Sequence, residues 1–130
     1  MRKEDATMTN FSFVLLYVDN PPASAAFYAE LLGRQPIENS PTFAMLPLSD
    51  TVMLGLWIRR NVDPKVIAPA GGSEIAFTVG DADAVNAMHD DWKRRGIAIA
   101  QAPTAMDFGH TFTAQDPDGH RIRVFSRAAA

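Results

Sequence analysis

The hydrophobic positions along the chain switch between strand-like and helix-like spacing. Residues 11–18 form an almost continuous apolar run with aromatic and β-branched side chains, which is typical of a buried strand. Asn20 and Pro21 suit the cap and the first position of a helix, which the Ala- and Leu-rich segment 23–32 continues up to Gly33. Three shorter strands are predicted after it, separated by turn residues, at 35–39, 42–46 and 52–59.

The second half of the chain repeats this order. A strand is predicted at 73–79, and Asp81 or Asp83 then caps a helix that runs to about Arg95. The apolar stripe of that helix consists of Val85, Met88 and Trp92. Three more strands are predicted at 97–102, 110–115 and 121–126, the last two joined by the hairpin signal Asp116-Pro117-Asp118-Gly119.

This repetition predicts an α+β fold made of two βαβββ modules. Module one spans about 11–60 and module two about 73–127, and the Pro- and Gly-containing stretch of about 61–72 is the linker within a single domain of 130 residues. Two such modules side by side are expected to form a curved mixed sheet around a cleft, with the helices outside.

Composition narrows the classes of function. The net charge of −3 offers no basic field to nucleic acid. The absence of cysteine excludes disulfides, thiolate metal sites and cysteine nucleophiles, and it fits a reducing compartment. No stretch approaches the roughly 20 apolar residues that span a bilayer. We therefore expect a cytoplasmic protein with neither nucleic acid nor membrane as its partner.

Three motifs resemble those of one family and occur in its order. The first is Leu16-Tyr17-Val18-Asp19-Asn20 with the helix that follows, the second is Glu74-Ile75-Ala76-Phe77-Thr78-Val79, and the third is Asp116-Pro117-Asp118-Gly119-His120-Arg121-Ile122-Arg123. Through them, residues 11–127 resemble the vicinal-oxygen-chelate superfamily of glyoxalases, dioxygenases and bleomycin-binding resistance proteins. Enzymes of this family bind a divalent metal through four strand positions that hold His, Gln or Glu.

The matching positions in this chain do not form such a ligand set. They are Phe13, Gly55 (to within one residue), Glu74 and Arg123. Only Glu74 offers a metal ligand, because an arginine guanidinium has donors and no acceptor. One carboxylate does not hold a divalent ion that normally takes three or more protein ligands. We therefore predict no metal and no cofactor, and an Arg123–Glu74 ion pair in their place.

Alternation along the strands places further side chains in the expected cleft. Gly55 would leave a gap beside Trp57, and aromatic rings with a few polar groups suit a planar ligand. The candidate ligand-binding residues are Phe13, Phe43, Gly55, Trp57, Glu74, Phe108, His110, Phe112 and Arg123. Five of them have a plainer alternative: the aromatic residues Phe43, Trp57 and Phe112 would belong to the core, and Glu74 and Arg123 would form a purely structural ion pair.

Within the superfamily, the chain resembles the phenazine-antibiotic resistance proteins. The resemblance rests on Leu16-Tyr17-Val18-x-Asn20, on Leu56-Trp57, on Phe108-Gly109-x-Thr111-Phe112 and on the closing motif. It implies metal-free sequestration of an aromatic small molecule by a homodimer. No catalytic residue is assigned, because the chain has no Gly-x-Ser-x-Gly elbow and no phosphate loop. The alternatives are a metal-dependent lyase or dioxygenase with an atypical site, and a regulatory module that binds a peptide or metabolite.

Overall fold

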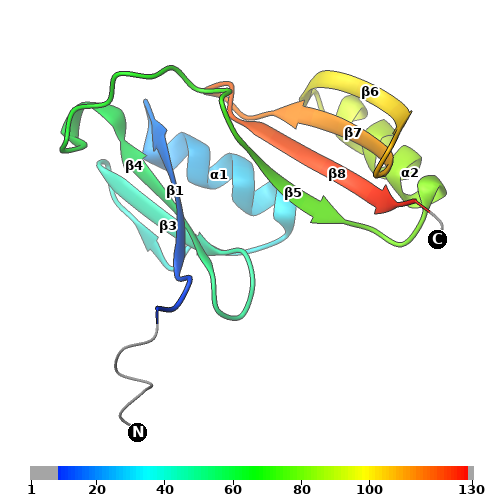
Figure 1. The fold of residues 1–130 in the computed structure, drawn as a ribbon. Coiled ribbons are helices and arrows are strands. Elements are labelled where there is room, and N and C mark those ends of the chain that lie inside the picture. Colours follow the sequence, from blue (N-terminus) through cyan, green and yellow to red (C-terminus); the bar gives the residue numbers. More distant parts are fainter. Residues whose placement is uncertain (1–8, 129–130) are drawn as a thin grey trace, which may run out of the picture. The chain divides into compact units, whose positions relative to one another are not determined.

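Each half of the chain forms a βαβββ unit, so the predicted α+β class is confirmed. The computed structural model describes residues 9–128. The chain divides into two compact units between Lys65 and Val66. Each unit contains one four-stranded mixed sheet with one helix packed against it (Figure 1).

In the first unit the sheet has the strand order β1-β4-β3-β2. The strands are β1 (Phe13–Val18), β2 (Glu38–Asn39), β3 (Phe43–Pro47) and β4 (Met53–Ile58), and a short 3₁₀ turn, η2 (Arg59–Asn61), follows. Strand β1 runs parallel to β4, whereas β3 is antiparallel to both of its neighbours. A parallel pair needs a crossover connection, which helix α1 (Pro21–Leu32) supplies.

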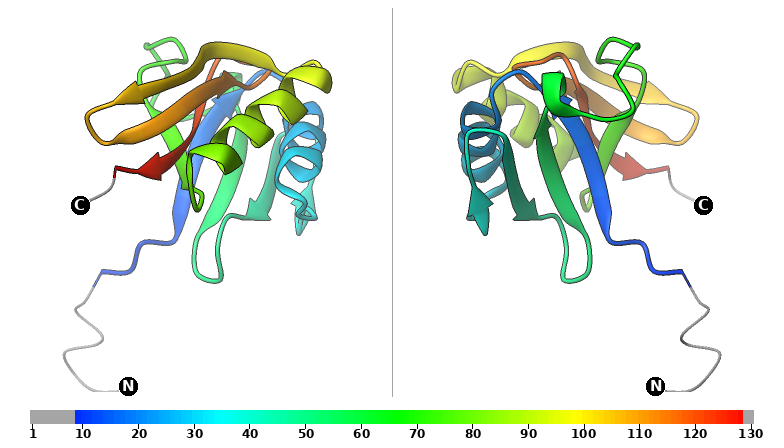
Figure 2. Two further views of the ribbon diagram at one scale, coloured as in Figure 1. Left: turned by 90° about the vertical axis from the view of Figure 1, so that its right-hand side faces the viewer. Right: turned by 90° about the vertical axis from the view of Figure 1, so that its left-hand side faces the viewer.

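Helix α1 begins and ends as the sequence predicts. The Asn20 side chain accepts a hydrogen bond from the Ala23 amide at 3.1 Å, which caps the helix. Gly33 ends it in the left-handed conformation, at φ 66°. The helix covers one face of its sheet (Figure 2, right), and the predicted core positions of that face, Leu16, Val18, Leu54 and Leu56, are buried beside Tyr28 and Leu31 of the helix.

The second unit has the same arrangement, with the strand order β5-β8-β7-β6. Its elements are β5 (Glu74–Thr78), α2 (Ala82–Arg94), β6 (Ala98–Met106), β7 (Gly109–Gln115) and β8 (Arg121–Arg127). Of the two predicted helix caps, it is Asp81 that accepts from the Ala84 amide, at 2.8 Å. Helix α2 lies on one face of the sheet (Figure 2, left). Trp92 of α2 packs edge-on against Phe112 of β7, and Ile122 and Val124 of β8 are also buried.

Two strands depart from their predicted bounds by more than two residues at one end. Strand β6 continues to Met106, past the predicted end at residue 102, because β7 pairs with it through two register shifts, one between Ile99 and Gln101 and one between Gln101 and Thr104. Strand β2 is reduced to Glu38–Asn39 from the predicted 35–39, because Pro36 has no amide hydrogen to donate to a ladder. Within residues 9–128, no helix has the length and apolar character of a membrane span.

Candidate functional site

In each unit, one face of the sheet turns away from the helix of that unit, and we call it the open face. In the first unit the open face is apolar and aromatic. Phe13 and Leu15 on β1 remain 42% and 44% exposed. Tyr17 lies opposite Trp57 in the β1–β4 register, and the two rings meet edge to face with centroids 6.3 Å apart. Phe43 on β3 is the other neighbour of Trp57. This is a surface on which a flat aromatic molecule can stack.

Gly55 lies at the centre of this open face, but it does not leave the gap that the sequence led us to expect. A Cβ atom on Gly55 would lie 2.5 Å from Leu15 Cδ2 and 3.2 Å from Phe43 Cζ. The side chains of Leu15 and Phe43 therefore fill the space above the glycine. Gly55 allows these two neighbours to close over the strand. Phe13 has the exposed ring at this face, and the rings of Tyr17, Phe43 and Trp57 are half-buried.

On the open face of the second unit, the predicted pairing of Glu74 with Arg123 is confirmed. Arg123 Nε donates to both carboxylate oxygens of Glu74, at 2.9 and 3.0 Å. The Arg123 side chain is 16% exposed and that of Glu74 is 34% exposed. The pair is therefore partly shielded from water, which makes the charge-assisted contact stronger than at a fully exposed site.

Arg123 also contacts the other two strands of its sheet. Its Nη1 donates to Gln101 Oε1 on β6 and to Thr111 Oγ1 on β7, each at 3.1 Å. Its guanidinium lies 5.7 Å from the ring centre of Phe108, which forms the β6–β7 turn and packs edge-on against Phe125. Sequence reasoning identified Phe108 but missed Gln101 and Thr111. The Thr-x-Thr alternation of β7 was the available signal for a polar open face.

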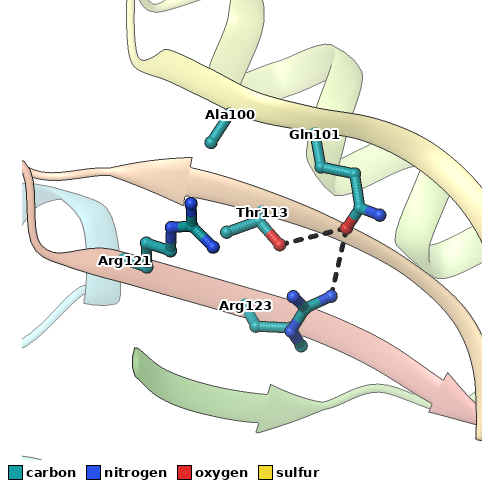
Figure 3. A pocket seen from close by; sticks show the side chains of 5 residues that line it. All are labelled: Ala100, Gln101, Thr113, Arg121 and Arg123. Carbon is teal, nitrogen blue, oxygen red and sulfur yellow. Dashed lines mark hydrogen bonds between the residues drawn. The ribbon is translucent and has the colours of Figure 1, made fainter. Parts of the chain in front are cut away.

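Beside this network lies a hollow of about 250 Å³, lined by Ala100, Gln101, Thr113, Arg121 and Arg123 (Figure 3). The side chains come from β6, β7 and β8. Thr113 Oγ1 donates to Gln101 Oε1 at 3.2 Å, so the same amide oxygen accepts from both Thr113 and Arg123. This shared acceptor fixes the Gln101 side chain at the rim of the hollow.

Two other candidate residues lie on the helix-covered face of this sheet. Phe112 is fully buried and packs edge-on against both Trp92 and His89. It therefore has the core position that the sequence left open as the alternative. His110 shares this strand face, and its Nε2 lies 2.8 Å from Asn86 Oδ1 of α2. Neither residue contributes to the two open faces.

The residues at the four family positions do not fit a divalent metal. Both oxygens of Glu74, the one carboxylate among them, accept hydrogen bonds from Arg123. Phe13 and Gly55 have no ligand atom in their side chains. Across residues 9–128, moreover, no group of three or more His, Cys, Asp or Glu side chains is arranged to hold a metal ion. No step of a metal-assisted reaction can be derived from this site.

Comparison with known proteins agrees with this architecture. Residues 10–124 match the Glyoxalase/Bleomycin resistance protein/Dioxygenase superfamily. Over 113 residues, 85% of this chain and 86% of the relative, the sequence is 30% identical to phenazine antibiotic resistance protein EhpR of Enterobacter agglomerans. The solution structure of protein ATC0852 from Agrobacterium tumefaciens is 49% identical, has a TM-score of 0.84, and covers 94% of this chain and 100% of that one.

A more distant structure shows the same fold. A glyoxalase-related enzyme from Fulvimarina pelagi superposes with a TM-score of 0.79 at 20% identity, covering 92% of this chain and 89% of the enzyme. The sequence match over residues 10–124 and the two βαβββ units lead to one conclusion. The chain belongs to the glyoxalase/bleomycin resistance protein/dioxygenase superfamily.

Proposed function

We propose that the protein binds a planar aromatic small molecule without a metal and sequesters it, as a resistance protein does for an antibiotic. The observation that supports this most directly is the 30% identity, over most of both chains, to a phenazine antibiotic resistance protein. Sequestration requires affinity alone, since a bound drug is removed from the free pool by mass action. As part of this proposal the protein acts in the cytoplasm, because a chain without cysteine fits a reducing compartment.

The open face of the first unit is the proposed stacking surface. Tyr17 and Trp57 are half-buried neighbours, and Phe13 adds an exposed ring on the same face. Ring stacking adds about 0.5 to 1.5 kcal/mol to the free energy gained from buried area. Since Trp57 would contribute both terms, its replacement by alanine should weaken binding about tenfold or more.

Tryptophan fluorescence tests this function directly. The chain has two tryptophans, Trp57 at the proposed surface and Trp92, which is 3% exposed in the core of the second unit. Titration with phenazine-1-carboxylate should quench the signal saturably in the unmodified protein and in the control Trp92→Phe. The saturable component should be absent from Trp57→Phe. The absence of saturable quenching up to high micromolar ligand, or quenching that persists in Trp57→Phe, would contradict the proposal.

A homodimer is part of the proposal. Phe13 and Leu15 form an exposed apolar pair on β1, and a second copy of the chain that covered them would remove this surface from water. Light scattering on the purified protein at micromolar concentration should give twice the mass of 14.2 kDa. A mass of one chain that does not change when ligand is added would contradict the predicted homodimer.

The proposal that the protein binds its ligand without a metal ion can be tested separately. Elemental analysis of protein purified without chelators should give far less than one equivalent of zinc, nickel, manganese or iron per chain. Full occupancy, or a lyase or dioxygenase activity that a chelator abolishes, would instead support a metal-dependent enzyme of the superfamily. Glu74 would then have to leave Arg123 in order to bind the ion, so metal binding and the ion pair would compete.

A further inference from the structure

The hollow on the open face of the second unit has more hydrogen-bond donors than acceptors. Its lining includes two guanidinium groups, Arg121 and Arg123, and the amide of Gln101. The Gln101 oxygen already accepts from Thr113 and from Arg123. A site with two guanidinium groups, whose amide oxygen already accepts two hydrogen bonds, favours an anion. We infer that this hollow binds the carboxylate of a small organic acid, and that Arg121 is the residue that recognises it.

Arg123 is already engaged, although the sequence suggested it as the partner of a ligand carboxylate. Its Nε donates to Glu74 and its Nη1 donates to Gln101 and Thr111. Only Nη2 makes no hydrogen bond within residues 9–128. Arg123 therefore organises the wall of the hollow and offers one nitrogen to a ligand.

Arg121 is in the opposite situation. It lies directly across the parallel ladder from Glu74, but both oxygens of that carboxylate accept from Arg123. The Arg121 guanidinium makes no hydrogen bond and no ion pair with any residue between 9 and 128. Its side chain lies over the hollow between β8 and Ala100 (Figure 3). A planar guanidinium placed in this way presents a fork that matches the two oxygens of a carboxylate.

Charge and size favour a carboxylate on a small aromatic group. Two guanidinium groups and one carboxylate leave a single positive charge uncompensated at this site, which matches a monoanion. The hollow of about 250 Å³ is smaller than the roughly 300 to 1,000 Å³ of pockets that enclose drug-sized molecules. It therefore has room for the acid end of a ligand. That the remainder of this small acid is aromatic rests on the proposed function.

Amide chemical shifts in a ¹⁵N-labelled protein of 14.2 kDa report this site directly. The probes are benzoate, its neutral analogue benzamide, and inorganic phosphate. Benzoate should shift the backbone amides of Gln101, Thr113 and Arg121 saturably, whereas benzamide and phosphate should not. The variant Arg121→Gln should weaken benzoate binding about tenfold or more, since a charge-assisted pair is lost.

Arg127→Gln is the matched control. Arg127 is an exposed arginine on the same face of β8, two positions beyond Phe125, and it does not line the hollow. Arg127→Gln removes the same single positive charge as Arg121→Gln, and it should leave the affinity for benzoate within about twofold of that of the unmodified protein. Equal shifts with benzamide, benzoate shifts that survive in Arg121→Gln, or no benzoate shifts at all would overturn the inference. A response to phosphate alone would overturn the assignment to a carboxylate.

Different experimental results would contradict the carboxylate site and the proposed stacking function. If phenazine-1-carboxylate quenches Trp57 but benzoate shifts no amide beside Arg121, aromatic binding stands and the carboxylate site is wrong. If benzoate binds at Arg121 but no phenazine quenches Trp57, the carboxylate site stands and the proposed stacking function is wrong.

Discussion

One arginine connects every strand of the second sheet, and removing it tests how the open face is held together. From β8, Arg123 reaches Glu74 on β5, Thr111 on β7 and Gln101 on β6. We predict that the replacements Arg123→Met and Glu74→Met are coupled in their effect on the free energy of unfolding. The unbranched methionine keeps most of the apolar stem in each case and removes the charge.

The size of this coupling follows from geometry and exposure. A hydrogen bond between charged groups contributes about 1.5 to 3 kcal/mol when it is shielded. Exposure of 16% for Arg123 and 34% for Glu74 allows solvent to screen part of it. A coupling free energy of about 1 to 2 kcal/mol is therefore expected. Arg123→Met alone should cost about 2 kcal/mol, because it also removes the donor to Thr111 and to Gln101.

Urea unfolding in a Trp57→Phe background measures this coupling. Trp92, buried against Phe112, is then the sole tryptophan and reports the second unit. The four members of the double-mutant cycle should share one m-value, so that differences in midpoint convert to free energy. The control is the cycle Asp91→Ala with Arg95→Ala, an i,i+4 pair at the end of α2. Its atoms are 3.3 Å apart, its side chains are 48% and 32% exposed, and its expected coupling is about 0.3 to 0.5 kcal/mol. A Glu74–Arg123 coupling no larger than this control would refute the reasoning.

Three further substitutions test local features of the fold, each by its effect on the urea midpoint. Asn20→Ala should cost about 1 kcal/mol because the side-chain cap of α1 is lost, and a neutral result would mean that the cap contributes nothing. Gly55→Ala should cost about 1 to 3 kcal/mol through the clash with Leu15, and less when combined with Leu15→Ala; strictly additive costs would contradict that contact. Gly109→Ala should lower the urea midpoint more than either of the other two, because the φ of 145° disfavours a side chain and the new Cβ would meet the Ser126 carbonyl oxygen. An unchanged midpoint would show that β7 does not begin with this backbone conformation.

The sequence by itself determined the order of elements and the two faces of each sheet. Side chains alternate along a strand, so the aliphatic positions Leu54 and Leu56 had to share one face and Met53 and Trp57 the other. The structure has this division, with Leu54 and Leu56 fully buried under α1. Helix ends were equally predictable, because Asn20 and Gly33 act on their own backbone within a few residues.

Local rules were insufficient where a neighbouring strand decided the outcome. Strand β6 runs past Pro103 because β7 supplies a partner through two register shifts, and pairing between strands depends on both sequences. The space above Gly55 was predicted to be empty, yet it is filled by Leu15 from the neighbouring strand β1 and Phe43 from β3. A glycine removes only its own side chain, and its neighbours decide whether a gap remains.

The tertiary structure also decided how the two arginines of β8 are used. Alternation placed Arg121 and Arg123 on the same face, and nothing in their local sequence distinguishes them. Arg123 makes the contacts because Gln101, Thr111 and Glu74 come within about 3 Å of it from three other strands. Arg121 has no hydrogen-bond partner among residues 9–128, because both oxygens of the carboxylate opposite to it accept from Arg123. Hydrogen bonds between side chains depend on distances across the sheet, which form only when the strands are paired.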